Sequence, residues 1–257
     1  MQGLVVAVGS LVFDHEGNLY GTSPTGGNGG YGFVYKLTPS NGGWTESEIY
    51  SFTGGDGADP YSGVIFDASG NLYGTTSGGG ARGAGTVFQL SPSGSGWTET
   101  TLYNFQGGGY EGAYPFGGVT FDHSGNLYGT TTGWGVWGGG TVFELSPVGG
   151  GWTFTLLHSF ADRAWAYAPP TVDAAGNVYG TTWHTGTYND GMVYKLTPSA
   201  TGWTFSSLHD FTGGSDGAWP ISDVIWDASG NLYGTATSGG AYCLPSLGCG
   251  VVWEITP

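Results

Sequence analysis

Basic residues are scarce in this chain of 257 residues. It has four Lys and Arg against 19 Asp and Glu, and its formal net charge is −15. This balance excludes binding to a nucleic-acid backbone, which depends on cationic side chains at the phosphates. No apolar run approaches the roughly 20 residues that a membrane-spanning helix needs. We therefore expect no nucleic-acid partner and no membrane span.

Charged residues of either sign are also few, at 9% of the chain against about 25% in ordinary globular domains. With 54 glycines, such a composition would indicate a disordered chain if aromatic residues were scarce too. They are not, because the chain has 11 Trp, 16 Tyr and 13 Phe, enough to build a core. The composition therefore favours an acidic, glycine-rich β protein.

Three sequence blocks recur along the chain. The string GN[LV]YGT is preceded by an Asp three residues before its first Gly, and a block such as GTVFQLSP follows it. A third block, WTxxx[IL][YH]xF, occurs four times, starting at Trp44, Trp97, Trp152 and Trp203. The GN[LV]YGT strings begin at Gly17, Gly70, Gly125, Gly176 and Gly230, so the period is 51 to 55 residues. A period near 50 with several strands per unit is typical of propeller blades.

We therefore predict an all-β fold, a five-bladed β-propeller with about four antiparallel strands per blade, in a single domain over residues 1–257. The approximate repeats are 1–53, 54–106, 107–161, 162–212 and 213–257. The fifth repeat has no WTxxx[IL][YH]xF block, so we expect the last blade to lack its outer strand. The edge of the strand Val251–Ile255 would then be open to association. Because Glu254 discourages such pairing, we favour a monomer over edge-mediated self-association.

These blocks, together with FxGGxDGAxP, resemble the bacterial GloVer tandem repeat along nearly the whole chain. That resemblance implies a secreted or surface-anchored protein without a well-established activity. The pattern FDxxGNLY is also similar to five-bladed tachylectin-type lectins and, more loosely, to NHL repeats. The lectin similarity implies sugar binding, but it transfers no contact residue to this chain.

Residues that recur in every repeat are interpreted as scaffold, with the Asp closing a turn and the Tyr packing between blades. The loops that vary between repeats are the better candidates for a site. Counting back eight residues from each turn Asp reaches Val6, Asp59, Tyr114, Trp165 and Trp219, a different side chain each time. The predicted ligand-binding residues are Tyr114, Trp134, Trp137, Arg163, Trp165, Trp183, His184, Tyr188, Asp190 and Trp219. Aromatic rings with scattered polar groups suit a carbohydrate, although the same rings could simply pack the loops.

Catalysis is a weaker hypothesis, since a glycosidase needs two suitably spaced carboxyl groups and sequence cannot show the spacing. The candidate carboxylates are Asp59, Glu111, Asp162, Asp190 and Asp216. We expect no cofactor and no metal, and the only calcium site considered, Asp56 with Asp59, ranks below a solvated acidic loop. Cys243 and Cys249 have no His nearby for a zinc site, and we expect them to form a disulfide.

The leading hypothesis is therefore an extracellular or cell-surface, lectin-like propeller that binds a carbohydrate on the face formed by its variable loops. A glycan-active enzyme, either a glycoside hydrolase or a lyase, is the alternative, and we lean against catalysis. A structural or assembly module is the third reading.

Overall fold

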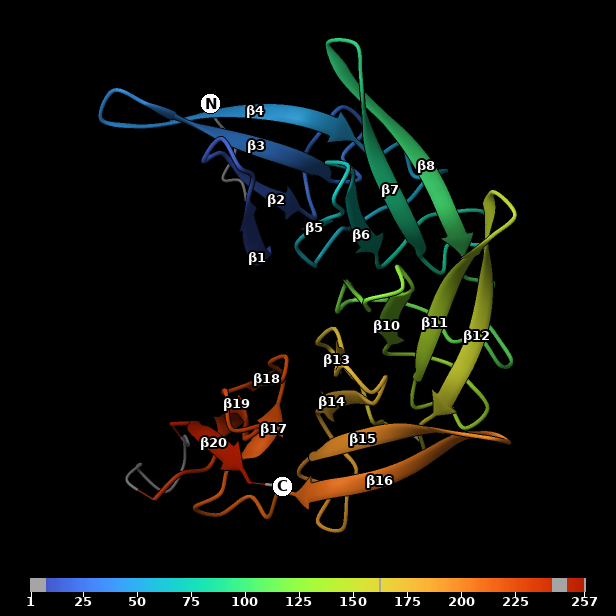
Figure 1. Ribbon diagram of the computed structural model, residues 1–257, viewed down its shortest axis with the longest axis vertical. Coiled ribbons are helices and arrows are strands. Elements are labelled where there is room, and N and C mark those ends of the chain that lie inside the picture. The colour runs from blue at the N-terminus through green and yellow to red at the C-terminus, as the bar shows by residue number, and fades with distance from the viewer. Residues whose placement is uncertain (1–7, 162, 242–248, 257) are drawn as a thin grey trace. The chain divides into compact units, whose positions relative to one another are not determined.

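The computed structural model describes residues 8–161, 163–241 and 249–256. These residues form twenty strands in five four-stranded antiparallel sheets (Figure 1). Four sheets follow the chain order strand by strand, which is the blade arrangement that the repeats predict. The all-β, five-bladed propeller class is confirmed. The described part of the chain contains no helix that could cross a membrane.

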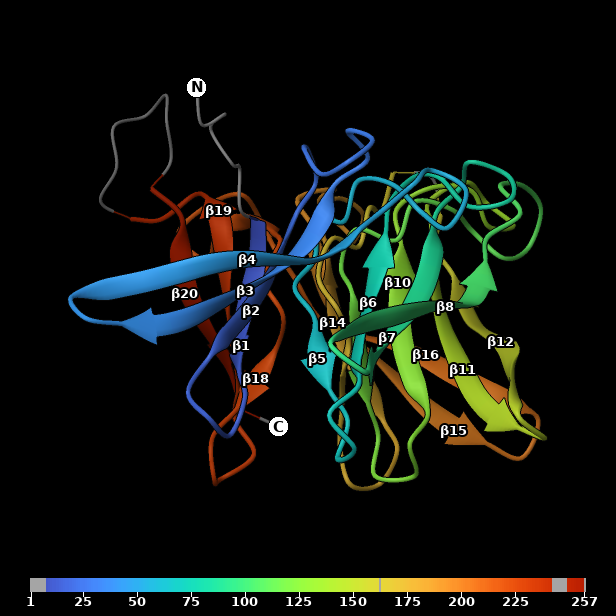
Figure 2. The ribbon, with the colours of Figure 1, turned by 90° about the horizontal axis from the view of Figure 1, so that it is seen from above.

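The chain divides into two compact units, which are described separately, so a single domain stays a prediction. Unit 1 is Met1–Gly107 with Ala113–Val119, and unit 2 is Gly108–Gly112 with Thr120–Pro257. The sheets of unit 1 are β1 (Val8–Phe13), β2 (Leu19–Ser23), β3 (Phe33–Ser40) and β4 (Gly43–Ser51), then β5 (Ile65–Phe66), β6 (Leu72–Thr76), β7 (Thr86–Ser93) and β8 (Gly96–Asn104). In Figure 2 the β3–β4 hairpin extends past β2, because β3 continues three residues beyond Leu37, the partner of Leu19.

Unit 2 holds the other three sheets, with only Val119 of β9 falling across the boundary. Their strands are β9 (Val119–Phe121), β10 (Leu127–Thr131), β11 (Thr141–Val148) and β12 (Gly151–Ser159); β13 (Thr171–Val172), β14 (Val178–Thr182), β15 (Met192–Ser199) and β16 (Gly202–Asp210); and β17 (Ala218–Pro220), β18 (Ile225–Trp226), β19 (Leu232–Ser238) and β20 (Val251–Ile255).

The fifth sheet corrects one expectation. It has four strands, so the prediction that the last blade lacks a strand is wrong in its count. Two short strands, β17 and β18, pair with opposite ends of β19 along one edge, and β20 pairs along the other. The segment Ala218–Pro220 was not predicted as a strand because it is short and contains proline.

The recurrent Asp closes a hairpin turn in every sheet, as predicted: between the first two strands of the first four sheets, and between β18 and β19 of the fifth. In the second sheet, Asp67 Oδ1 accepts the backbone N–H groups of Ser69 and Asn71, while Oδ2 accepts the Asn71 amide and the Tyr73 hydroxyl. The other four turns repeat this pattern of four hydrogen bonds, around Asp14, Asp122, Asp173 and Asp227. A turn bonded in this way fixes the register of the strands on either side.

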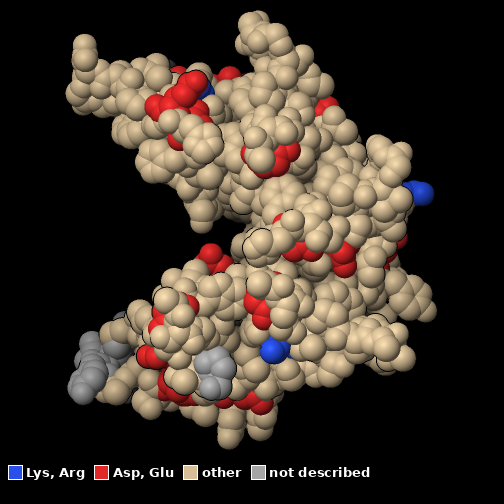
Figure 3. Space-filling model, in the orientation of Figure 1, with Lys and Arg blue, Asp and Glu red and all other residues tan. Residues whose placement is uncertain are grey.

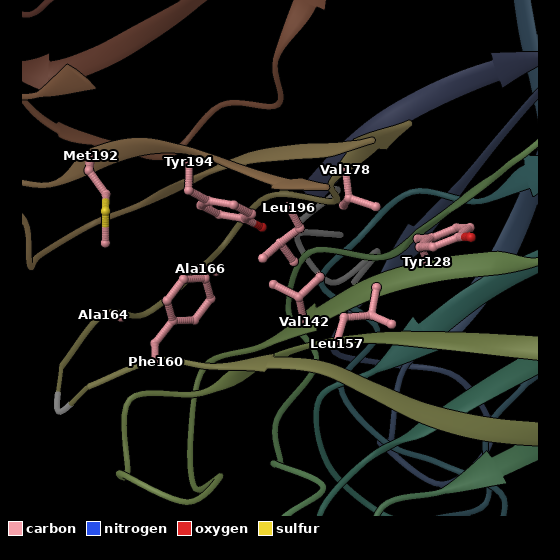
Figure 4. Close-up of a cluster of buried hydrophobic side chains, with 10 residues drawn as sticks. All are labelled: Tyr128, Val142, Leu157, Phe160, Ala164, Ala166, Val178, Met192, Tyr194 and Leu196. Atoms are coloured by element: carbon pink, nitrogen blue, oxygen red, sulfur yellow. The ribbon is translucent and has the colours of Figure 1, made fainter. Parts of the chain in front are cut away.

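One core cluster of unit 2 lies between the third and fourth sheets, and a second lies between the fourth and fifth. Figure 4 shows side chains of β15, among them Tyr194 and Leu196, facing Val142 of β11 and Phe160, the residue that follows the outer strand β12. Phe160 meets the Tyr194 ring edge-on at 5.1 Å. Burial of such side chains is worth about 2 kcal/mol each. Unit 1 repeats this packing around Val34, Phe52 and Phe88.

The pairing register brings two loops to the same end of each sheet. In the fourth sheet Thr182, the last residue of β14, pairs with Met192, which in turn pairs with Asp210 at the end of β16. The loop between the second and third strands therefore leaves beside the loop that follows the fourth strand. These paired loops carry the residues that vary between repeats.

Candidate functional site

One backbone position in these loops has the same unusual conformation in four repeats. Asp59, Tyr114, Trp165 and Trp219, the residues eight before each turn Asp, have φ angles of 56°, 60°, 44° and 57°. This left-handed region costs a non-glycine residue about 1–2 kcal/mol, so the surrounding structure must impose it. The fifth such residue, Val6, lies outside the described residues.

Hydrogen bonds from neighbouring repeats hold this position. The backbone N–H of Trp219 donates to the carbonyl of Asp190 at 2.8 Å, and that of Trp165 donates to Gly139 at 3.3 Å. In unit 1, Asp59 and Tyr114 donate in the same way to Tyr31 and Ala84, both at 2.9 Å. Each acceptor stands directly before the glycine that leads into a third strand. The position therefore ties one repeat to the next and presents whatever side chain it carries.

In unit 2 these positions assemble an aromatic surface. We call Trp165, Trp183, His184 and Trp219 the Trp/His cluster. The Trp183 ring lies 5.4 Å from Trp165 and 6.2 Å from Trp219, and it stacks on His184 at 4.9 Å. Trp219 stands nearly perpendicular to both Trp183 and His184, at 79° and 78°. The rings thus form a corner. Trp219 makes one side of it, and the stacked Trp183 and His184 rings make the other.

The cluster stays accessible to solvent although its backbone is fixed. Trp219 is 37% exposed, and the other three rings are half-buried. The N–H groups of Trp183 and His184 donate to the carbonyls of Trp165 and Ala164, both at 3.2 Å. His184 Nδ1 lies 3.1 Å from the Asn189 carbonyl. Because a carbonyl only accepts, Nδ1 carries the proton and Nε2 remains the other polar position of the ring.

A fifth ring, that of Tyr167, joins the cluster, although Tyr167 was not among the predicted binding residues. Tyr167 meets Trp183 edge-on at 5.6 Å. Burial alternates along Ala164–Ala168, with alanines buried and Trp165 and Tyr167 half-buried between them. The alternation of alanine with aromatic residues in AWAYA was the available sequence signal, since it matches the alternation of buried and half-buried side chains here.

The other six predicted binding residues have different surroundings in the described part of the chain. Asp190 lies beside the cluster through its backbone bond to Trp219. Trp137 lines a cavity of about 640 Å³ with His158, Phe205 and Thr185. The others are exposed side chains, which are Tyr114 in unit 1 and Trp134, Arg163 and Tyr188 in unit 2.

The candidate carboxylates have different surroundings. Asp216 accepts hydrogen bonds from the Thr212 N–H and hydroxyl and lies 3.1 Å from His209 Nε2. Burial opposes its ionisation, but these bonds outweigh it and hold the pKa of Asp216 below its usual value. Burial raises the pKa of Asp59 in unit 1. In unit 2 one carboxylate oxygen of Glu111 is buried without a hydrogen-bond partner.

These carboxylates form no metal centre among the described residues. Asp162 lies outside them, and no described group of three His, Cys, Asp or Glu has the arrangement of a metal site. Asp56, which with Asp59 formed the weak calcium hypothesis, accepts hydrogen bonds from the Tyr50 hydroxyl and the Thr53 N–H. Figure 3 shows Asp and Glu scattered over the face in view in small groups. Cys243 also lies outside the described residues, so its bond to Cys249 stays a prediction.

One perturbed carboxyl group was not among the candidates. Glu99 on β8 is half-buried, and burial, with Asp56 nearby, raises its pKa to about 7 despite a hydrogen bond from Thr101. Phe154 and Phe205 occupy its position in the third and fourth sheets, and Phe205 stacks on His158 there. Phenylalanine at the equivalent position of two other repeats was the sequence signal that a side chain there is packed against its neighbours.

We expect Glu99 to make the stability of the protein fall as the pH rises. Its pKa is higher in the folded chain than in the unfolded one, so its contribution is complete below about pH 4.5 and is lost as the pH rises through about 7. Glu99→Gln should match the parent protein at pH 4.5 and exceed it by about 1 kcal/mol at pH 8, after allowance for solvent screening.

Urea unfolding at the two pH values measures this effect. Glu46→Gln is the matched control, because Glu46 occupies the same strand position in the first sheet and is exposed. Equal pH dependence in the parent protein and in Glu99→Gln would contradict the assignment.

Comparisons with known proteins agree with this architecture. Residues 154–257 match a family model described as the Gloeobacter/Verrucomicrobia repeat. The match confirms the GloVer-type resemblance over that part of the chain. No curated protein matches the chain.

Solved structures resemble the chain in fold. A gluconolactonase from Xanthomonas campestris has 14% sequence identity and a TM-score of 0.58, covering 96% of this chain and 71% of that one. A candidate gluconolactonase has 17% identity and a TM-score of 0.57, covering 99% and 75%. A protein of unknown function from Dyadobacter fermentans has 13% identity and a TM-score of 0.55, covering 98% and 79%. At these identities the likeness shows the propeller fold alone.

Proposed function

We propose that the Trp/His cluster binds a carbohydrate, and that the protein is an extracellular or cell-surface glycan-binding propeller. The observation that carries the proposal is the corner formed by Trp219 against the stacked Trp183 and His184 rings. A sugar ring has an apolar C–H face and a polar edge, so it can lie on one aromatic ring while its hydroxyls reach polar groups beside it.

The chemistry around the corner fits a neutral sugar. His184 Nε2 and Asp190 provide polar groups for hydroxyls, and the net charge of −15 disfavours an anionic ligand. Backbone hydrogen bonds hold the main chain at Trp165, Trp183 and Trp219, and contacts between their rings order the side chains, which reduces the entropic cost of binding. The fold of a gluconolactonase, whose name denotes a sugar lactone, lends weaker support.

The alternative function is a glycan-active hydrolase or lyase. It would need a pair of carboxyl groups about 5–10 Å apart across the scissile bond. Asp190 is the candidate carboxylate beside the cluster, and Glu111 has a buried carboxylate oxygen without a partner in the same unit. A product assay on any bound glycan separates this function from simple binding.

A glycan array followed by calorimetry on each hit tests the proposal. We expect Trp219→Ala to weaken binding by about five- to thirtyfold, which corresponds to the loss of 1–2 kcal/mol of ring stacking. Its thermal stability should change little, because the ring is partly exposed and Ala keeps the same backbone. Trp44→Ala is the matched control, since Trp44 is 48% exposed on the outer strand of the first sheet.

Two outcomes would contradict carbohydrate binding at this cluster. The first is that the folded protein retains no glycan on the array. The second is that Trp219→Ala binds as well as the parent protein while Trp44→Ala loses affinity.

A further inference from the structure

The tryptophans of two outer strands, β8 and β16, each pack on a recurrent tyrosine of the preceding sheet. In unit 1, Trp97 of β8 lies 6.1 Å from the ring of Tyr20 on β2. In unit 2, Trp203 of β16 packs against the cluster that contains Tyr128 of β10. Tyr20 and Tyr128 are both only 4% exposed as a result. This contact is a repeated element of sheet-to-sheet packing.

Tyr179 of β14 holds the same position in the fourth sheet but has no such cover among the described residues. It keeps the contact with an aromatic ring of the next sheet, since Trp226 of β18 meets it edge-on at 5.0 Å, just as Phe66 of β5 meets Tyr20 at 5.1 Å. No described tryptophan takes the place of Trp97 or Trp203, however, and Tyr179 is only half-buried.

A cavity of about 540 Å³ lies at this place. It is lined by Tyr179, Lys195, Leu208, Trp226 and Ile255, among others. Leu208 is 36% exposed, whereas Leu157, its counterpart on β12, is 7% exposed beneath the fourth sheet. Ile255 is half-buried, whereas its counterpart Leu196 is fully buried. Leu208 and Ile255 thus occupy positions that are buried in another repeat, but here no described neighbouring side chain buries them to the same extent.

The strand beside the cavity has an available edge. β20 pairs with β19 on one side, and no described strand pairs with its other side. In the other four sheets the corresponding strand pairs on that side with a strand that begins Gly-Trp-Thr. Unpaired backbone groups at a sheet edge are ready to accept an added strand.

We infer that this edge and cavity bind an extended segment of the GWTxxx[IL] type, carried on polypeptide outside these 257 residues, with its tryptophan in the cavity at Tyr179. The segment adds a further strand to the four-stranded fifth sheet. In the register of β15 and β16, Leu196 faces Phe205, two residues after Trp203. Ile255 would therefore face the residue two positions after the tryptophan of the segment.

The strands that already carry this pattern do not supply the occupant. β4, β8, β12 and β16 are each paired within their own sheets, so a second copy of the chain would have to break a sheet to offer one. The cavity of about 540 Å³ is lined by aromatic and aliphatic side chains together with Lys195, Asp173 and Asp227, and its apolar part suits a large ring. The occupant is therefore defined by its sequence pattern and by its source outside the chain.

A synthetic peptide with the sequence of Gly202–Asp210, GWTFSSLHD, provides the probe. Titrated into the folded protein and followed by fluorescence anisotropy, it should bind saturably at one site. The same peptide with Ala in place of Trp should bind at least about tenfold more weakly, since buried tryptophans dominate such interfaces.

Two protein variants locate the binding. Leu208→Asp places a charge in the cavity, and Val252→Pro places a proline at the open strand, so each should weaken peptide binding by about tenfold or more. The control is Val148→Asp, which puts the same charge on an exposed aliphatic residue of β11. Circular dichroism and thermal unfolding confirm that each variant is folded.

Four results would overturn the inference. If the folded protein does not bind the peptide, the site does not exist. If the Trp and Ala peptides bind equally well, the cavity does not receive the tryptophan. Binding that appears only after deletion of residues 2–7 would make this chain's own N-terminal segment the occupant. Concentration-dependent dimers that Leu208→Asp abolishes would make the occupant a second copy.

Discussion

Replacing Gly139 with alanine should destabilise the protein by at least about 3 kcal/mol, because overpacking against backbone is costly when neither partner can move away. A Cβ atom at Gly139 would overlap the carbonyl oxygen of Ala161. The Gly139 carbonyl also accepts the N–H of Trp165, and its strand bridge to Trp134 ties the residue to the preceding loop. The alanine would therefore push apart the two segments that present Trp165.

Thermal unfolding measures this effect. At roughly 2–4 °C per kcal/mol for a chain of this size, the midpoint should fall by about 6–12 °C. Gly151→Ala is the matched control, because the nearest atom to its Cβ would be the Val148 carbonyl oxygen at 3.9 Å. A midpoint within 2 °C of the parent protein would show that the Gly139 loop relaxes freely, and that the Trp165 position is not rigidly held.

The repeat made it possible to predict the fold from the sequence. Five copies of one turn, in which Asp67 and its counterparts accept the same four hydrogen bonds, fix five pairs of strands at a constant spacing. Local chemistry of this kind acts within six residues, so sequence reasoning can reach it. The count of strands in the fifth sheet was wrong because Ala218–Pro220 pairs with β19 through tertiary context, not through its own strand preference.

The candidate site could be predicted only in part from the sequence. The sequence selected loops that vary and a position that recurs, and Trp165 and Trp219 do share a left-handed backbone there. Which rings meet depends on side-chain direction across two repeats, and loop sequence alone does not specify it. Tyr167 and Glu99 were missed for the same reason, although alternation with alanine marks the first and phenylalanine in the equivalent repeats marks the second.

Removing the turn carboxylate in Asp67→Ala should cost about 2–3 kcal/mol, since bonds to an ionised acceptor are stronger than neutral ones and their donors are left unsatisfied. The Tyr73 hydroxyl already accepts a bond from Gln89, so its own proton needs the Asp67 oxygen. Asp227→Ala removes the same four hydrogen bonds at an exposed turn, where water can replace them. Its effect should therefore be smaller, and urea unfolding of both variants at pH 6 tests the difference.

The cost of Asp67→Ala should also depend on pH in the direction opposite to that of Glu99. Burial opposes ionisation of Asp67, but its hydrogen bonds outweigh burial and hold the pKa of Asp67 below its usual value. A lowered folded-state pKa gives stability that is present above about pH 4 and is lost as the pH falls through the folded value. The difference between the parent protein and Asp67→Ala should shrink below pH 4. Because Glu99 removes stability as the pH rises through about 7, the parent protein should be most stable between these limits. A stability that still rises from pH 7 to pH 9 would contradict this balance.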